Sequence, residues 1–80
     1  SRVSIDDNSE YYLTDVASCA FSYPVENFEC WIRLTTAASG TVTITFPTSE
    51  YIGDAPSFGN GETWEISIKD GVIASAKVGA

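Results

Sequence analysis

The side chains that could do chemistry in this chain are its carboxylates, its two cysteines and its two tryptophans. The 80 residues hold 11 Asp and Glu against 4 Lys and Arg, a formal net charge of −7, and no histidine. Without histidine there is no Ser-His-Asp or Cys-His catalysis and no imidazole acid or base. A protein that binds a phosphate backbone needs clustered Lys and Arg. We therefore expect no enzyme activity, no catalytic residue, no cofactor and no nucleic-acid partner.

The carboxylates raise two further possibilities. Asp6, Asp7, Asn8 and Glu10 could offer oxygen ligands to Ca²⁺, but the run lacks the glycine and the spaced carboxylates of an EF-hand loop. A solvated turn is the favoured interpretation. Paired carboxylates could also hydrolyse a glycoside, but no second lobe or long set of loops builds a cleft around such a pair. We expect no metal site.

The elements that position these residues are strands. Six Val, seven Ile and eight Thr stand against two Leu, and β-branched side chains suit a pleated surface. We expect an all-β fold, either a small antiparallel β-sandwich or a partly open barrel of six to seven short strands, with no significant helix. The expected strands are 16–23, 28–36, 41–46, 62–69 and 72–78, with a short one near 51–52 and less distinct ones at 4–6 and 11–13.

Residues 28–36 alternate strictly between apolar and polar side chains, which indicates one buried and one outer face. Their apolar set continues in 41–46, and an antiparallel pairing through the loop 37–40 places Leu34 opposite Val42 and Ile32 opposite Ile44. The last hairpin turns at Asp70-Gly71, either as a three-residue loop that pairs Ile66 with Ala74 or as a two-residue turn that pairs Ile66 with Ser75. The first register is preferred because its inner face is uniformly apolar. The predicted core is Phe28, Cys30, Ile32, Leu34, Val42, Ile44, Phe46, Trp64, Ile66 and Ile68.

Trp31 falls on the outer face of its strand. A large ring there either packs under a loop or marks a surface that binds sugar or another subunit. In the preferred hairpin register Ile73 also lies outside. The candidate interface or ligand surface therefore comprises Trp31, Arg33, Thr43, Thr45 and Ile73.

The two cysteines lie on the same face of neighbouring predicted strands. If residues 24–27 form a four-residue hairpin loop, Phe21 faces Cys30, and Cys19 faces Ile32, one pair out of register. Two reduced core thiols are favoured over a disulfide because this register misaligns the bridge. The disulfide remains the alternative.

The chain from Phe28 onward resembles a small all-β module of tailed-bacteriophage fibre and appendage proteins and of their prophage copies in gut bacteria. The matching residues are Phe46-Pro47, Gly53, Ala55-Pro56, Gly61, Trp64–Ile68 and Asp70-Gly71. The resemblance implies a virion structural or attachment part, made in the host cytoplasm and often assembled as a homotrimer with other virion proteins. It also implies a host-surface receptor, such as a glycan, and carries over no catalytic residue.

The alternative is a bacterial cell-surface or secreted β-sandwich module that binds carbohydrate or protein through Trp31 and Tyr51. In either case we expect a single β domain over residues 1–80, with its first fifteen residues weakly defined. Because the sequence begins with Ser1, we expect a fragment of a longer chain. No apolar run reaches the roughly 18–20 residues of a membrane span, so no membrane insertion is expected.

Overall fold

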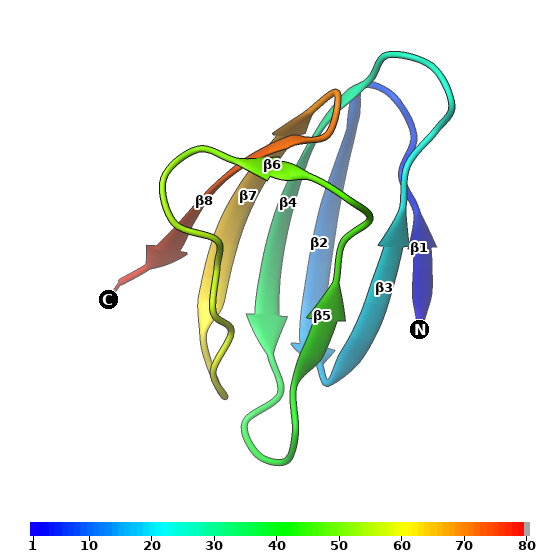
Figure 1. Ribbon diagram of the computed structural model, residues 1–80. Helices are drawn as coiled ribbons and strands as arrows, with labels where there is room; N and C mark the ends of the chain where they lie inside the picture. Colours follow the sequence, from blue (N-terminus) through cyan, green and yellow to red (C-terminus); the bar gives the residue numbers. More distant parts are fainter. Residues whose placement is uncertain (80) are drawn as a thin grey trace.

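The computed structural model describes residues 1–79, and within them the chain forms strands and loops but no helix (Figure 1). The all-β prediction is therefore confirmed. None of these residues forms a helix that could cross a membrane. The strands are β1 (Arg2–Ser4), β2 (Ser9–Val16), β3 (Ser18–Ser22), β4 (Glu29–Thr36), β5 (Thr43–Thr45), β6 (Glu50–Tyr51), β7 (Thr63–Lys69) and β8 (Val72–Val78).

The eight strands in residues 1–79 form two sheets, with the orders β1-β3-β5 and β2-β4-β7-β8-β6. The chain passes back and forth between them, so that β1, β3 and β5 run parallel in one sheet while β2 and β4 run parallel in the other. The expectation of a wholly antiparallel fold is wrong. A chain that crosses through the other sheet before it returns to the first one adds its next strand in the same direction. The result is a solenoid-like coil. Only β4-β7 and β7-β8 are antiparallel among the described strands.

Strand β4 takes β7, and not β5, as its antiparallel partner. Leu34 faces Trp64 and Ile32 faces Ile66, so the predicted hairpin between 28–36 and 41–46 is wrong. The alternating pattern of β4 suits either partner, because period-2 alternation sets which face is buried but not which strand lies alongside. The loop after β4 crosses to the smaller sheet, and the Asn60 side chain holds it there by donating to the backbone oxygens of Ala37 (3.1 Å) and Gly40 (2.7 Å).

The hairpin expected between 16–23 and 28–36 is also wrong. Strand β3 lies in the three-stranded sheet and β4 in the five-stranded one. Residues 24–27 are therefore a connection between sheets. The rings of Tyr23 and Phe28 nevertheless meet across it, with centroids 4.9 Å apart.

The β7-β8 hairpin adopts the register of the two-residue turn, so the prediction of a three-residue loop is wrong. Ile66 faces Ser75, Trp64 faces Lys77 and Ile68 faces Ile73. Asp70 (φ 50°) and Gly71 (φ 80°) both have positive φ, as a two-residue type I′ turn requires, and such a turn matches the twist of the flanking strands. Ile73 is therefore 1% exposed, and its assignment to the outer surface is wrong.

The core draws on both sheets. Its buried residues are Ile5, Val16, Cys19, Phe21, Phe28, Cys30, Ile32, Leu34, Ile66, Ile68 and Ile73. Ile44, Phe46 and Trp64 are partly buried and pack against this cluster. Val42 is half-buried, because it precedes β5, a short strand at the edge of its sheet.

The first fifteen residues have more structure than their sequence indicates. Strand β1 pairs with β3, and β2 pairs with β4 along Ser9–Leu13 before a register shift near Asp15. Asp15 has φ 53°, consistent with a bulge at a sheet edge. Both pairings are parallel and join segments far apart in the chain, so no local turn signal announces them.

The register of the last hairpin can be tested at Ile73. Replacing this fully buried side chain in Ile73→Ala should lower the free energy of unfolding by about 2–5 kcal/mol, since it removes core contacts and leaves a cavity. Val78→Ala, on the same strand but 38% exposed, should change it by roughly 0.5 kcal/mol or less. Urea unfolding at equilibrium gives both values. Equally small changes in the free energy of unfolding for both variants would favour the register of the three-residue loop, in which Ile73 faces outward.

Candidate functional site

Trp31 and a row of smaller side chains lie on the outer face of the five-stranded sheet. Across the strands, Glu10 of β2 pairs with Trp31, Trp31 with Ser67, and Ser67 with Ala74. Beyond Ala74, Ile52 follows β6 and its N–H donates to the Ile73 oxygen (2.8 Å). The row therefore runs from a carboxylate through an indole ring and two small side chains to a second apolar residue.

This arrangement produces an open groove, here called the Trp31 groove, with a volume of about 730 Å³. Ser67 and Ala74 contribute to its floor between Trp31 and Ile52, because neither side chain fills the space above its strand. The residues lining it are Asn8, Ser9, Glu10, Glu29, Cys30, Trp31, Ile52, Ser67, Ile68, Lys69, Asp70, Val72 and Ala74.

Three carboxylates and one ammonium line the Trp31 groove. The Lys69 ammonium lies 3.7 Å from a Glu29 carboxylate oxygen, and both side chains are well exposed. Asp70 has a structural task, since its Oδ1 accepts a hydrogen bond from the Phe28 N–H (2.8 Å). The rim of the groove is therefore net acidic.

Tyr12 supports Trp31 from the neighbouring strand. The two rings meet edge to face with centroids 5.6 Å apart, and the Tyr12 hydroxyl donates to Glu10 Oε1 (3.2 Å). Partial desolvation and the adjacent Glu10 carboxylate raise the pKa of Tyr12 above its ordinary value. The sequence did not single out Tyr12; the signal that could have found it is its alternation with Tyr11 and Leu13, which puts it on the outer face.

The structure does not bring the predicted surface residues together. Trp31 and Arg33 share the outer face of β4, where the Arg33 guanidinium binds the Glu65 carboxylate (2.5 Å). Thr43 and Thr45 lie on β5 in the other sheet, and Ile73 is buried. Tyr51 pairs with Ile73 and does not line the groove, whereas the next residue, Ile52, does.

The acidic run near the N-terminus is organised by the fold. Asp7 Oδ1 accepts a hydrogen bond from the Glu29 N–H (3.0 Å), and the Asn8 N–H donates to the Glu29 oxygen (2.8 Å). Asn8 has φ 57°, a conformation its side chain tolerates in turns. Among residues 1–79, no group of three or more His, Cys, Asp or Glu is placed to hold a metal ion.

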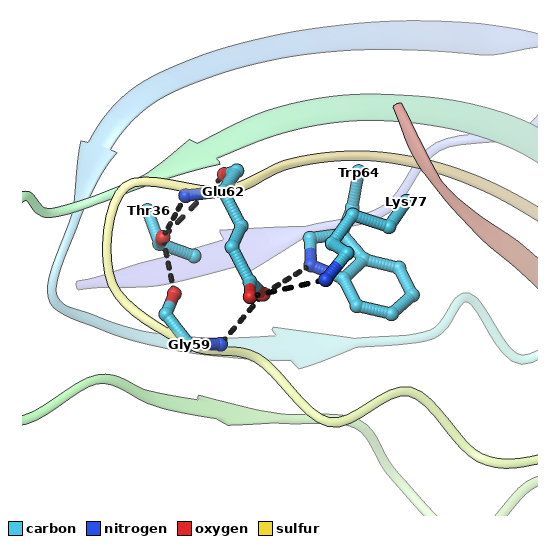
Figure 2. A network of polar contacts seen from close by, with 5 residues as sticks. All are labelled: Thr36, Gly59, Glu62, Trp64 and Lys77. Atoms are coloured by element: carbon cyan, nitrogen blue, oxygen red, sulfur yellow. Dashed lines mark hydrogen bonds and ion pairs between the residues drawn. The ribbon is translucent and has the colours of Figure 1, made fainter. Parts of the chain in front are cut away.

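A second polar cluster surrounds Glu62 at the start of β7 (Figure 2). Its Oε1 accepts hydrogen bonds from the Gly59 N–H (2.7 Å) and the Trp64 indole N–H (3.0 Å), while Lys77 lies 3.5 Å from Oε2. Thr36, which is buried, donates to the Gly59 oxygen (2.5 Å) and accepts from the Glu62 N–H (2.9 Å). Every member of the cluster has a partner, so it acts as a structural tie between the 48–61 loop and the larger sheet.

Cys19 and Cys30 are free and buried. They belong to different sheets, so the prediction that they lie on neighbouring strands is wrong. Burial raises the pKa of both thiols, that of Cys30 to about 11. Since the thiolate is the reactive form, neither sulfur is poised as a nucleophile.

Comparisons with protein-family models, curated proteins and solved structures give no match for this chain.

The Glu62 cluster should make stability depend on pH. The Gly59 N–H, followed by the Trp64 indole, lowers the pKa of Glu62 from its ordinary 4.5, so ionised Glu62 stabilises the fold above pH 4.5. That stabilisation should disappear as the pH falls through the lowered pKa. Glu62→Gln should be less stable than the unmodified protein at pH 7, and the difference in urea midpoint should shrink toward pH 3. Glu26→Gln, in the 24–27 loop, is the control. If the difference in urea midpoint between Glu62→Gln and the unmodified protein does not change with pH, the charge of Glu62 does not have this role.

The state of the two thiols can be read by titration with a disulfide reagent. The folded protein should react slowly, because both sulfurs are buried and their pKa values are raised. In guanidinium chloride both cysteines of the chain should react. Absence of any reactive thiol after unfolding would instead demonstrate a disulfide.

Proposed function

We propose that this chain is a non-enzymatic structural and attachment module of a bacteriophage fibre or appendage, with a sandwich-like packing of its two sheets. The Trp31 groove is the attachment surface, and it is the observation that carries the proposal. An exposed, partly apolar groove with an aromatic wall and a polar rim is the kind of surface that proteins use for recognition. The resemblance from Phe28 onward supports placing the module on a virion, made in the host cytoplasm.

The chemistry of the groove favours binding over catalysis. Glu29 is paired with Lys69, and Asp70 is occupied by the Phe28 N–H. General acid–base catalysis needs a group whose pKa and geometry are set for proton transfer. Asp70 instead holds the scaffold, Glu29 forms an exposed ion pair, and Glu10 accepts a hydrogen bond from Tyr12, which supports a recognition role.

Assembly into a homo-oligomer is part of the proposal. Strands β1 and β5 are the outer strands of the smaller sheet, and β2 and β6 are those of the larger sheet. Outer strands present unpaired backbone donors and acceptors to a partner. A second groove of about 640 Å³ lies between the β1 and β2 edges, with Val3, Leu13, Val16 and Cys19 among its lining. These edges are the proposed contacts within a trimer and with other virion proteins.

A bacterial surface or secreted module that binds carbohydrate is the second candidate. The indole ring beside hydrogen-bonding groups such as Asn8 and Ser67 favours it, because sugars stack on aromatic faces while polar groups orient their hydroxyls. Tyr51, which the sequence suggested as a second platform, does not line this groove.

Attachment through Trp31 can be measured with the labelled protein on intact bacterial cells and on a glycan array. Retention on cells should fall for Trp31→Ala and should stay unchanged for Val25→Ala, which alters a fully exposed apolar residue outside the groove. Sedimentation velocity on the same samples should give a trimer. Equal retention of both variants would contradict attachment through the groove, and a monomer would contradict the proposed assembly. Trp31-dependent binding to a glycan without cell specificity would favour the second candidate.

A further inference from the structure

On the basis of the attachment function above, we propose that the Trp31 groove accepts an arginine side chain from a segment of a partner protein. The guanidinium would lie over the Trp31 indole, between the carboxylates of Glu10 and Glu29. The partner is thus a basic polypeptide surface.

The register of the sheet places both carboxylates beside the indole. Glu10 pairs directly with Trp31 across β2 and β4, and neighbouring strands are about 4.8 Å apart. Glu29 lies two residues before Trp31 on the same face, about 7 Å along the strand. A cation resting on the indole is therefore within reach of both acidic side chains.

The groove carries a net negative charge, which a bound cation would partly neutralise. Glu10, Glu29 and Asp70 face a single ammonium, that of Lys69, a formal charge of −2. In the next row the Arg33 guanidinium is already held by Glu65. Within residues 1–79 the Glu10 carboxylate has the Tyr12 hydroxyl as its hydrogen-bond partner and forms no ion pair.

An arginine fits these features better than a lysine. Its planar guanidinium stacks on an aromatic face and donates two parallel hydrogen bonds to a carboxylate, whereas an ammonium acts as a point charge. The small side chains of Ser67 and Ala74 leave room beside the indole for a flat group. Val72 and Ile52, further across the groove, provide apolar surface for the aliphatic stem.

The overall charge favours a basic polypeptide over an anionic glycan. At −7, the chain repels phosphorylated or sialylated surfaces and attracts basic ones, which raises the rate of encounter at low salt. A neutral sugar could still stack on Trp31, but it would leave the acidic rim without a counter-charge.

The test is a nuclear magnetic resonance titration of the ¹⁵N-labelled protein with a blocked peptide containing two arginines. Its twin carries citrulline, which keeps the shape and removes the charge. The arginine peptide should shift the Trp31 indole N–H and the amides of Ser67 and Ala74, leave the Trp64 indole unmoved, and bind more weakly at high salt. Trp31→Ala and Glu10→Gln should each weaken binding about two- to fivefold, as expected for exposed cation–π and ion-pair contacts.

Glu26→Gln is the matched control. It removes the same charge by the same substitution, at an exposed residue that lines neither groove. Its affinity for the arginine peptide should equal that of the unmodified protein. If circular dichroism shows that Trp31→Ala does not fold, Glu10→Gln and Glu10→Lys still test the proposal, because they leave the Trp31 ring in place.

Equal binding of the citrulline peptide, or an unchanged affinity in Glu10→Gln, would overturn the arginine assignment. Binding of a neutral oligosaccharide that depends on Trp31, with no binding of the arginine peptide, would overturn it while leaving attachment through the groove intact. If neither probe moves the Trp31 resonance, the inference is wrong, and the absence of Trp31-dependent cell retention would then remove the proposed function as well.

Discussion

The placement of β4 between β2 and β7 is the constraint on which the rest of the structure depends. One side of this strand supplies Cys30, Ile32 and Leu34 to the core, and the last two have no exposed surface. Because successive side chains of a strand point to opposite faces, burial of that side obliges Trp31 and Arg33 to face outward. The hydrophobic core and the outward-facing indole are therefore two consequences of one strand's alternation.

The groove also depends on ties made far from Trp31. Its opposite wall, Ile52, belongs to the 48–61 segment, which is anchored to β8 by the Ile52 N–H and to the larger sheet by Glu62 and Thr36. A buried hydroxyl such as that of Thr36 destabilises a fold unless it finds partners, and no buried side-chain polar atom of the described chain lacks one. The segment is thereby ordered by these ties together with the short pairing of β6 with β8, and the groove keeps both walls.

Much of the local structure was predictable from the sequence, and the errors share one cause. The strand from Glu29 to Thr36 and the last two strands lie where the alternation of residue types indicates. The predicted partner of β4 and the predicted register at Asp70-Gly71 were wrong, because apolar side chains of similar size occur on several strands and satisfy more than one pairing. The type I′ turn, with positive φ at Asp70 and Gly71, matches the twist of the flanking strands, and this match outweighed the more uniform apolar face of the three-residue-loop register.

The sequence by itself determined the all-β class, the inward and outward faces of β4 and β7, and the outward position of Trp31, because these follow from residue type and period-2 geometry along a single segment. Tertiary structure alone decided which strands are neighbours. Parallel pairing brought Tyr12 and Glu10 beside Trp31, the tight turn buried Ile73, and the crossing of β5 to the other sheet removed Thr43 and Thr45 from the site. Those outcomes depend on contacts between distant segments, for which one strand's pattern carries no unique partner, and so the groove exists only in the folded chain.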